Sequence, residues 1–148
     1  MKKIAIALVV GWLAFQVAAV EGEWMTDLAK AQEKAKAEKK LVLVDFTGSD
    51  WCPPCKALHK NVFSSAEFKE FAAKNLVLVE VDFPRKKEQT EQVKKANREL
   101  AKKHDIDGYP TVIVFDSNGK QLDKKVGYSG ASAKDYVAQL AKLKEKNT

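Results

Sequence analysis

Three short apolar runs in the middle of the chain constrain its fold more than any other feature. They are Leu41–Phe46, Leu76–Val81 and Thr111–Phe115. Each run is rich in β-branched residues and nearly continuous, without a regular alternation of apolar and polar positions. A strand has this pattern when both faces of its sheet are covered by helices. The sequence therefore predicts an α/β fold.

Segments with the spacing of amphipathic helices separate these runs. In the first, Trp24 shares the helical spacing of Leu28, and Thr26 or Asp27 can cap the start. Ser64 and Glu67 resemble a capping box, so we expect a break in the helical structure near Ser64. The predicted helices cover residues 26–39, 52–63, 64–72, 90–103 and 133–146.

An Asn-Gly turn follows the last apolar run. Asn118-Gly119 is typical of a hairpin, and it predicts that Leu122–Val126 returns antiparallel to Thr111–Phe115. Parallel units followed by a hairpin give a mixed central sheet of about four strands, flanked by helices.

The N-terminus has the layout of a secretory signal peptide. Lys2 and Lys3 precede an apolar stretch over residues 4–20, and Val17-Ala18-Ala19 offers small residues for cleavage. We expect residues 1–19 to be a signal peptide and residues 20–148 to be one domain, located in the periplasm or otherwise outside the cytoplasm. The alternative is an uncleaved membrane anchor, although the stretch is short of the roughly 20 apolar residues that a spanning helix needs.

Charge excludes one class of function. The formal net charge is +6, and it falls to +4 without Lys2 and Lys3 (24 basic against 20 acidic residues). The lysines lie beside glutamates in helical segments, as in residues 88–95, which is typical of solvated helix faces. No basic stripe with interleaved aromatic residues is present, so we expect no nucleic-acid partner.

Both cysteines of the chain lie in one motif, Trp51-Cys52-Pro53-Pro54-Cys55-Lys56. Cys52 follows a strand and a loop and precedes a helix, and a helix N-terminus favours thiolate over thiol. Cys52 could then attack a disulfide, and Cys55 could resolve the mixed disulfide. Lys56 could support the thiolate or only solvate the helix.

Two other uses of the cysteines stay open at this point. A structural disulfide would close only a small ring, which stabilises a fold weakly. A zinc or copper site could combine Cys52 and Cys55 with His59 and His104. A third alternative is a binding module that has the fold without turnover.

The chain resembles the thioredoxin superfamily, and within it the exported thioredoxin-like disulfide reductases. The resemblance rests on the strand Leu41–Phe46, the motif Trp51–Lys56 at a helix start, and Gly108–Thr111 entering a later strand. It extends over roughly Leu41 to Leu143. It implies a cis Tyr109–Pro110 bond, with Pro110 beside Cys52 and the backbone of Tyr109 pairing with an extended substrate segment.

The resemblance also implies roles for further residues. Trp51 matches the tryptophan that contacts substrate in thioredoxins, although simple packing would explain it equally well. We assign Pro53 and Pro54 to the same substrate-binding surface, because they form part of the motif. No cofactor is implied, and we expect a monomer that acts on protein disulfides or dithiols.

Asp45 matches the buried acid that exchanges a proton with the second cysteine, here Cys55. The loop Thr47–Trp51 is one residue longer than in thioredoxin, so Asp45 could instead cap the loop. Glu80 and Asp82 are expected to be surface or loop-capping groups. Together these features predict a thiol:disulfide oxidoreductase that works as a reductase and receives electrons from a membrane donor.

Overall fold

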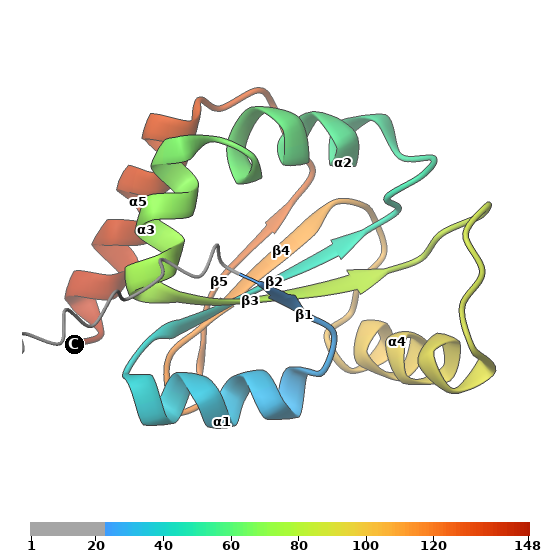
Figure 1. Cartoon of the computed structure of the whole chain (residues 1–148), viewed down its shortest axis with the longest axis horizontal. Coiled ribbons are helices and arrows are strands. Elements are labelled where there is room, and N and C mark those ends of the chain that lie inside the picture. The colour runs from blue at the N-terminus through green and yellow to red at the C-terminus, as the bar shows by residue number, and fades with distance from the viewer. Residues whose placement is uncertain (1–22) are drawn as a thin grey trace, which may run out of the picture.

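A five-stranded mixed sheet forms the centre of the computed structural model, which describes residues 23–148 (Figure 1). The strand order is β1-β3-β2-β4-β5, with β1 and β2 parallel to β3, and β4 antiparallel to both β2 and β5. The strands are β1 Trp24–Met25, β2 Leu41–Thr47, β3 Leu76–Asp82, β4 Thr111–Phe115 and β5 Gln121–Val126. The predicted α/β class, the mixed sheet and the hairpin are therefore confirmed.

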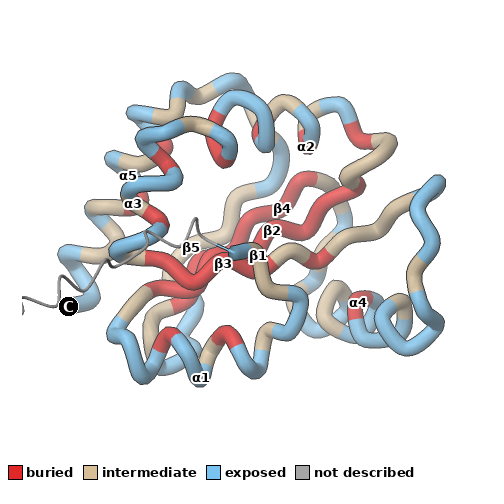
Figure 2. The backbone as a smooth tube through the Cα atoms, viewed as in Figure 1, coloured by how far each residue is buried: buried red, intermediate tan, exposed pale blue. Residues whose placement is uncertain are grey.

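Helices cover both faces of the sheet. α2, η1, α3 and α5 pack on one face, and α1 and α4 pack on the other (Figure 1). The helices are α1 Leu28–Glu38, α2 Pro53–Leu58, the π-helical turn η1 His59–Phe63, α3 Ala66–Asn75, α4 Glu91–Lys103 and α5 Ala133–Lys146. Burial follows this layering, because the central strands are buried while the outer helical faces are exposed (Figure 2).

The first strand is a departure from the sequence prediction. Trp24 does not continue the first helix; it pairs with Leu78 at the edge of the sheet, and its ring lies 5.1 Å from the ring of Phe63. Asp27 is extended, and its carboxylate caps α1 by accepting a hydrogen bond from the amide of Lys30. The sheet therefore has five strands where about four were predicted.

The predicted break near Ser64 is present, but the capping residue is its neighbour. Ser64 ends the η1 turn, with its amide donating to the carbonyl of His59 at 2.9 Å. Ser65 then caps α3, because its Oγ accepts a hydrogen bond from the amide of Phe68. The expected Ser64–Glu67 box is wrong by one position.

Side chains of β2 alternate strictly between the two helical layers. Leu41 and Leu43 pack with α2, η1, α3 and α5, whereas Val42, Val44 and Phe46 pack with α1 and α4. These five side chains are at most 2% exposed. Burying each one contributes roughly 1.5–3 kcal/mol. The alternation also assigns Asp45 to the same face as Leu43.

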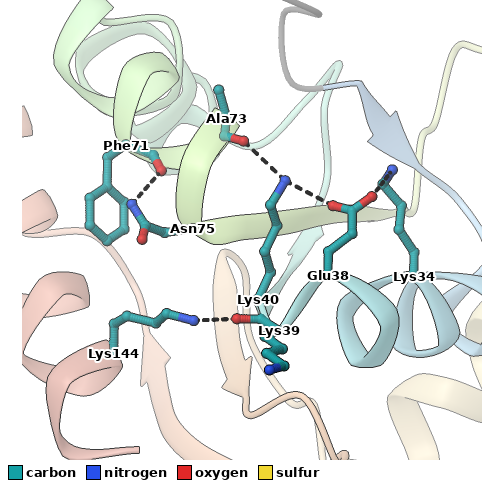
Figure 3. Close-up of polar contacts among 8 residues, drawn as sticks. All are labelled: Lys34, Glu38, Lys39, Lys40, Phe71, Ala73, Asn75 and Lys144. Atoms are coloured by element: carbon teal, nitrogen blue, oxygen red, sulfur yellow. Dashed lines mark hydrogen bonds and ion pairs between the residues drawn. The ribbon is translucent and has the colours of Figure 1, made fainter. Parts of the chain in front are cut away.

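A polar network closes the end of the sheet where β2 and β3 begin (Figure 3). Lys40 Nζ pairs with Glu38 at 2.8 Å and donates to the carbonyl of Ala73 at 3.0 Å. Lys144, from α5, donates to the carbonyl of Lys39, which ends α1 in a left-handed conformation. These contacts tie the last turns of α1 and α3 to α5 at the end opposite to the cysteine motif.

The expected signal peptide, residues 1–19, lies outside the described residues. Across residues 23–148, the helices are all too short or too polar to cross a membrane.

Candidate active site

Cys52 and Cys55 form a disulfide at the start of α2, with their Cα atoms 5.3 Å apart. Cys52 is the N-cap residue, and Pro53 and Pro54 occupy the first helical turn, where a missing N–H costs no helical hydrogen bond. Cys52 donates its amide to the carbonyl of Gly48 at 2.9 Å and accepts from the amide of Lys56 at 3.1 Å. The disulfide therefore sits where the partial positive charge of the helix N-terminus favours a thiolate on Cys52 after reduction.

Trp51 is packed beside the disulfide by groups from three loops. Its Nε1 donates to the carbonyl of Phe83 at 2.8 Å. The rings of Trp51 and Tyr109 are nearly perpendicular, with their centroids 5.9 Å apart. A Cβ on Gly48 would lie 2.6 Å from Trp51 Nε1, so only glycine leaves room for the indole. The indole of Trp51 is therefore fixed against the backbone of its own loop.

The Tyr109–Pro110 bond is cis, as the family resemblance implies. Pro110 is buried, and its carbonyl accepts a hydrogen bond from the amide of Gly127 at 2.7 Å. The ring of Tyr109 lies between those of Trp51 and Phe83, 5.2 Å from the latter. The contact with Trp51 brings the Tyr109–Pro110 segment next to the residue that precedes Cys52.

Asp45 and Cys55 line the same cavity. This cavity has a volume of about 270 Å³. Its lining residues are Asp45, Thr47, Ser49, Cys55, Lys56, His59, Glu80 and Lys87. Asp45 is buried, and its Oδ1 has no hydrogen-bond partner within residues 23–148. The extra loop residue does not turn Asp45 away from Cys55, since both residues line this cavity. The amides of Trp51 and Cys52 both donate to the carbonyl of Gly48, which keeps the loop compact.

The surroundings of Asp45 favour its protonated form. Burial, and then the charges of Glu80 and Asp82, raise the pKa of Asp45 to about 8. The pKa of Glu80 is also raised, first by burial and then by Asp82, while Lys87 and His59 oppose the rise. A carboxyl group with a pKa near neutrality can both accept and return a proton under ordinary conditions.

Glu80 is the site residue that the sequence analysis placed wrongly. It is half-buried and lines the cavity with Asp45 and Cys55, where a surface or loop-capping position was expected. Asp82 does cap a loop, since its carboxylate accepts from the amide of Ser49 at 2.9 Å. The register of β2 against β3 would have identified Glu80, because it is the direct partner of Asp45.

The two histidines of the metal hypothesis lie on opposite sides of the sheet. His59 lines the cavity with Cys55, whereas the ring of His104 packs against those of Phe46 and Phe115, at 6.3 Å and 5.5 Å. Nowhere in the described part of the chain do three or more His, Cys, Asp or Glu side chains group to hold a metal ion. The structure does not assemble the four-ligand site.

Known proteins resemble this chain over most of its length. The family model described as a thioredoxin-like domain matches residues 28–144. The "Disulfide bond reductase DsbH" of Chlamydia pneumoniae is 36% identical over 124 residues, which cover 84% of this chain and 74% of that protein. The "Thiol:disulfide interchange protein DsbD" of Actinobacillus pleuropneumoniae is 34% identical, but the match covers 82% of this chain and 19% of that protein.

A solved structure agrees with these sequence matches. The structure described as "DsbH Oxidoreductase" has a TM-score of 0.77 and 34% identity, and the match covers 88% of this chain and 89% of that one. Three findings point to one family: the family model, the 36% identical relative and the shared fold. The Cys52–Cys55 disulfide at the start of α2 is consistent with all three. The chain belongs to the thioredoxin-like family, and it is a thiol:disulfide oxidoreductase.

Proposed function

We propose that this protein reduces disulfides in other proteins outside the cytoplasm, using Cys52 and Cys55 as a dithiol. The observation that carries the proposal is the cavity in which Cys55 meets Asp45, an acid whose pKa is raised to about 8. A resolving cysteine needs a nearby base to remove its proton, and Asp45 can serve as that base.

The reaction begins with Cys52 as a thiolate. Its sulfur attacks one sulfur of the substrate disulfide, a mixed disulfide forms, and the other substrate sulfur leaves as a thiolate that takes a proton from water. The N-terminus of α2 stabilises the attacking thiolate, because Cys52 is its N-cap residue.

The second step releases the substrate. Asp45 accepts the proton of the Cys55 thiol, and the Cys55 thiolate attacks Cys52 and breaks the mixed disulfide. The second substrate sulfur leaves as a thiolate and is protonated by the solvent. Two electrons have then passed from the dithiol to the substrate, and the Cys52–Cys55 disulfide remains.

The substrate segment lies across Trp51 and Tyr109 in this proposal. Pro110, Pro53 and Pro54 form the rest of the contact surface around Cys52. The edge-to-face contact of Trp51 with Tyr109 supports this arrangement, because it holds both aromatic rings together beside Cys52.

The reducing direction and the location rest on two further observations. The relative of 36% identity is named a disulfide bond reductase, and residues 2–20 have the layout of a cleaved signal peptide. In this setting the protein acts as a monomer and receives its electrons from a membrane donor, since each turnover leaves it oxidised.

Trapping of mixed disulfides tests the roles of the two cysteines. Cys55→Ser in its reduced form should accumulate mixed disulfides with disulfide-containing substrate proteins, because nothing resolves the Cys52 adduct, and alkylation of free thiols then preserves the adducts for detection. Cys52→Ser should trap little, since Cys52 and not Cys55 is the N-cap residue whose thiolate the start of α2 stabilises. Equal trapping by the two variants, or none by either, would contradict the assignment.

A redox titration against glutathione tests the direction. Family potentials extend from about −270 mV for thioredoxin to about −120 mV for the most oxidising members. If the protein is a reductase, the potential of its Cys52–Cys55 pair should lie near that of thioredoxin. A value near the oxidising end would overturn the reductase proposal while leaving the oxidoreductase chemistry intact.

A further inference from the structure

Arg85 stacks on the tryptophan of the redox motif. Its guanidinium carbon lies 3.8 Å from the centroid of the Trp51 ring, and the arginine itself is exposed. Stacking orients the flat guanidinium parallel to an aromatic face and leaves N–H donors at its edge free for a carboxylate. This contact could not be predicted from local pattern, because Arg85 lies 34 positions after Trp51 (85 minus 51).

The segment that carries Arg85 is fastened to the redox loop. Asp50, directly before Trp51, accepts hydrogen bonds from the amides of Arg85, Lys86 and Lys87 at 3.0, 2.7 and 3.0 Å. Those hydrogen bonds lower the pKa of Asp50 to about 2, so the carboxylate stays ionised at neutral pH. The β2–α2 loop and the β3–α4 connection accordingly run side by side at this end of the sheet (Figure 1).

The side chains of Arg85 and Lys86 are positive charges without an ion-pair partner in the described part of the chain, whereas the charge of Lys87 acts on Glu80 without forming an ion pair. Within residues 23–148, none of the ion pairs includes Arg85, Lys86 or Lys87. Asp50 is the acid closest in sequence to the motif, and its oxygens are occupied by backbone amides. Lys87 donates to the hydroxyl of Ser49 at 3.1 Å, which is a neutral acceptor. The rim beside Trp51 is therefore a preformed cationic surface.

We propose that Arg85 selects substrate proteins that carry an aspartate or glutamate next to the disulfide to be reduced. The substrate carboxylate pairs with the guanidinium edge while the substrate segment lies across Trp51. This inference rests on the proposed function, and it adds the chemistry of the preferred substrate. An exposed pair of this kind contributes up to about 1 kcal/mol, which corresponds to roughly a fivefold change in affinity.

Peptide binding tests the inference independently of turnover. Two peptides of one sequence, with serines in place of both cysteines, carry either glutamate or glutamine beside the first serine. Isothermal titration calorimetry on the full-length oxidised protein should give the glutamate peptide about fivefold tighter binding, and added salt should reduce the difference. Arg85→Gln should bring the ratio of the two affinities to about one.

Two variants make the comparison specific. Arg85→Lys keeps the charge but loses the planar stack, so it should retain only part of the preference. Arg98→Gln removes an exposed arginine from α4 and should leave the preference unchanged. Equal affinities in the unmodified protein, or a preference that survives Arg85→Gln, would overturn the inference. A protein that shows the preference but fails to reduce the cysteine forms of the peptides would instead contradict the proposed function.

Discussion

Asp45 and Glu80 are register partners on the parallel strands β2 and β3, and both line the cavity beside Cys55. Two carboxylates on one face repel each other, so the charge of Glu80 helps to keep Asp45 protonated. Glu80 thereby influences Asp45, the proposed proton acceptor, through its charge. Substitution of Glu80 should therefore change the pH dependence of mixed-disulfide resolution and leave the fold intact.

Glu80→Gln should lower the pKa of Asp45, because an ionised Asp45 no longer faces a second negative charge. Asp45 is then available as a base at lower pH, and resolution of the mixed disulfide should become about threefold faster near pH 6.5. Stopped-flow kinetics of single-turnover reduction across the pH range would measure this shift. Glu99→Gln, an exposed position on α4, provides the control. An unchanged profile in Glu80→Gln would show that the two carboxyls are not coupled.

Asp45→Asn should stabilise the protein, and the gain should grow with pH. The pKa of Asp45 is raised from its ordinary value of 3.8 to about 8 in the folded state. Between pH 3.8 and about pH 8, Asp45 therefore holds a proton in the folded state that it has lost in the unfolded state. The wild-type protein therefore loses stability as the pH rises through this window, and the loss is complete above about pH 8.

Urea unfolding at about pH 5 and about pH 9 would measure this effect, with a difference on the order of 2–4 kcal/mol in favour of Asp45→Asn at the higher pH. Asp107→Asn changes an exposed aspartate and should show no comparable trend. A stability gain for Asp45→Asn that is constant with pH would mean that the folded protein does not hold the Asp45 proton.

Gly48→Ala should displace Trp51. The added methyl group would lie 2.6 Å from Trp51 Nε1, well inside van der Waals contact, so the indole or the loop must shift. Overpacking of this kind costs about 1–3 kcal/mol. Unfolding by urea and the tryptophan fluorescence spectrum would report the two effects. Gly108→Ala is the matched control, because its new methyl group meets only Val126 Cγ1 at an ordinary 3.5 Å.

Asp50→Ala should release the segment Arg85–Lys87, whose three backbone amides it holds. Limited trypsin digestion, with cleavage sites assigned by mass spectrometry, should then show several-fold faster cleavage after these basic residues. Asp107→Ala should not change the rate at these sites. Because the pKa of Asp50 is lowered to about 2 from 3.8, this restraint is present above about pH 4 and is lost as the pH falls toward 2.

The sequence could predict the parts of the fold that depend on local pattern. Apolar runs identified β2, β3 and β4, and the Asn-Gly turn identified the hairpin, because each signal lies within a few neighbouring residues. The two-residue strand at Trp24 was missed, since so short a segment has no period of its own. The spacing of Trp24 matched the following helix by coincidence.

The residues of the site also fall into those that local sequence pattern predicts and those that depend on the packing of distant segments. Cys52 and Cys55 were evident from their spacing, and the cis Tyr109–Pro110 bond followed from the resemblance. Glu80 and Arg85 were not identified, because their places depend on strand register and on a loop held by Asp50. Contacts of that kind arise only when segments distant in sequence have packed together.

The strict alternation along β2 limits how this strand can vary in length. Leu43 and Asp45 face the layer that contains Cys55, and Val44 and Phe46 face the layer that contains His104. One residue inserted between Leu41 and Asp45 would turn half of the strand over. Such a chain could keep its apolar faces in place or keep the carboxyl beside Cys55, but it could not keep both. Viable relatives should therefore differ in this stretch only by even numbers of residues.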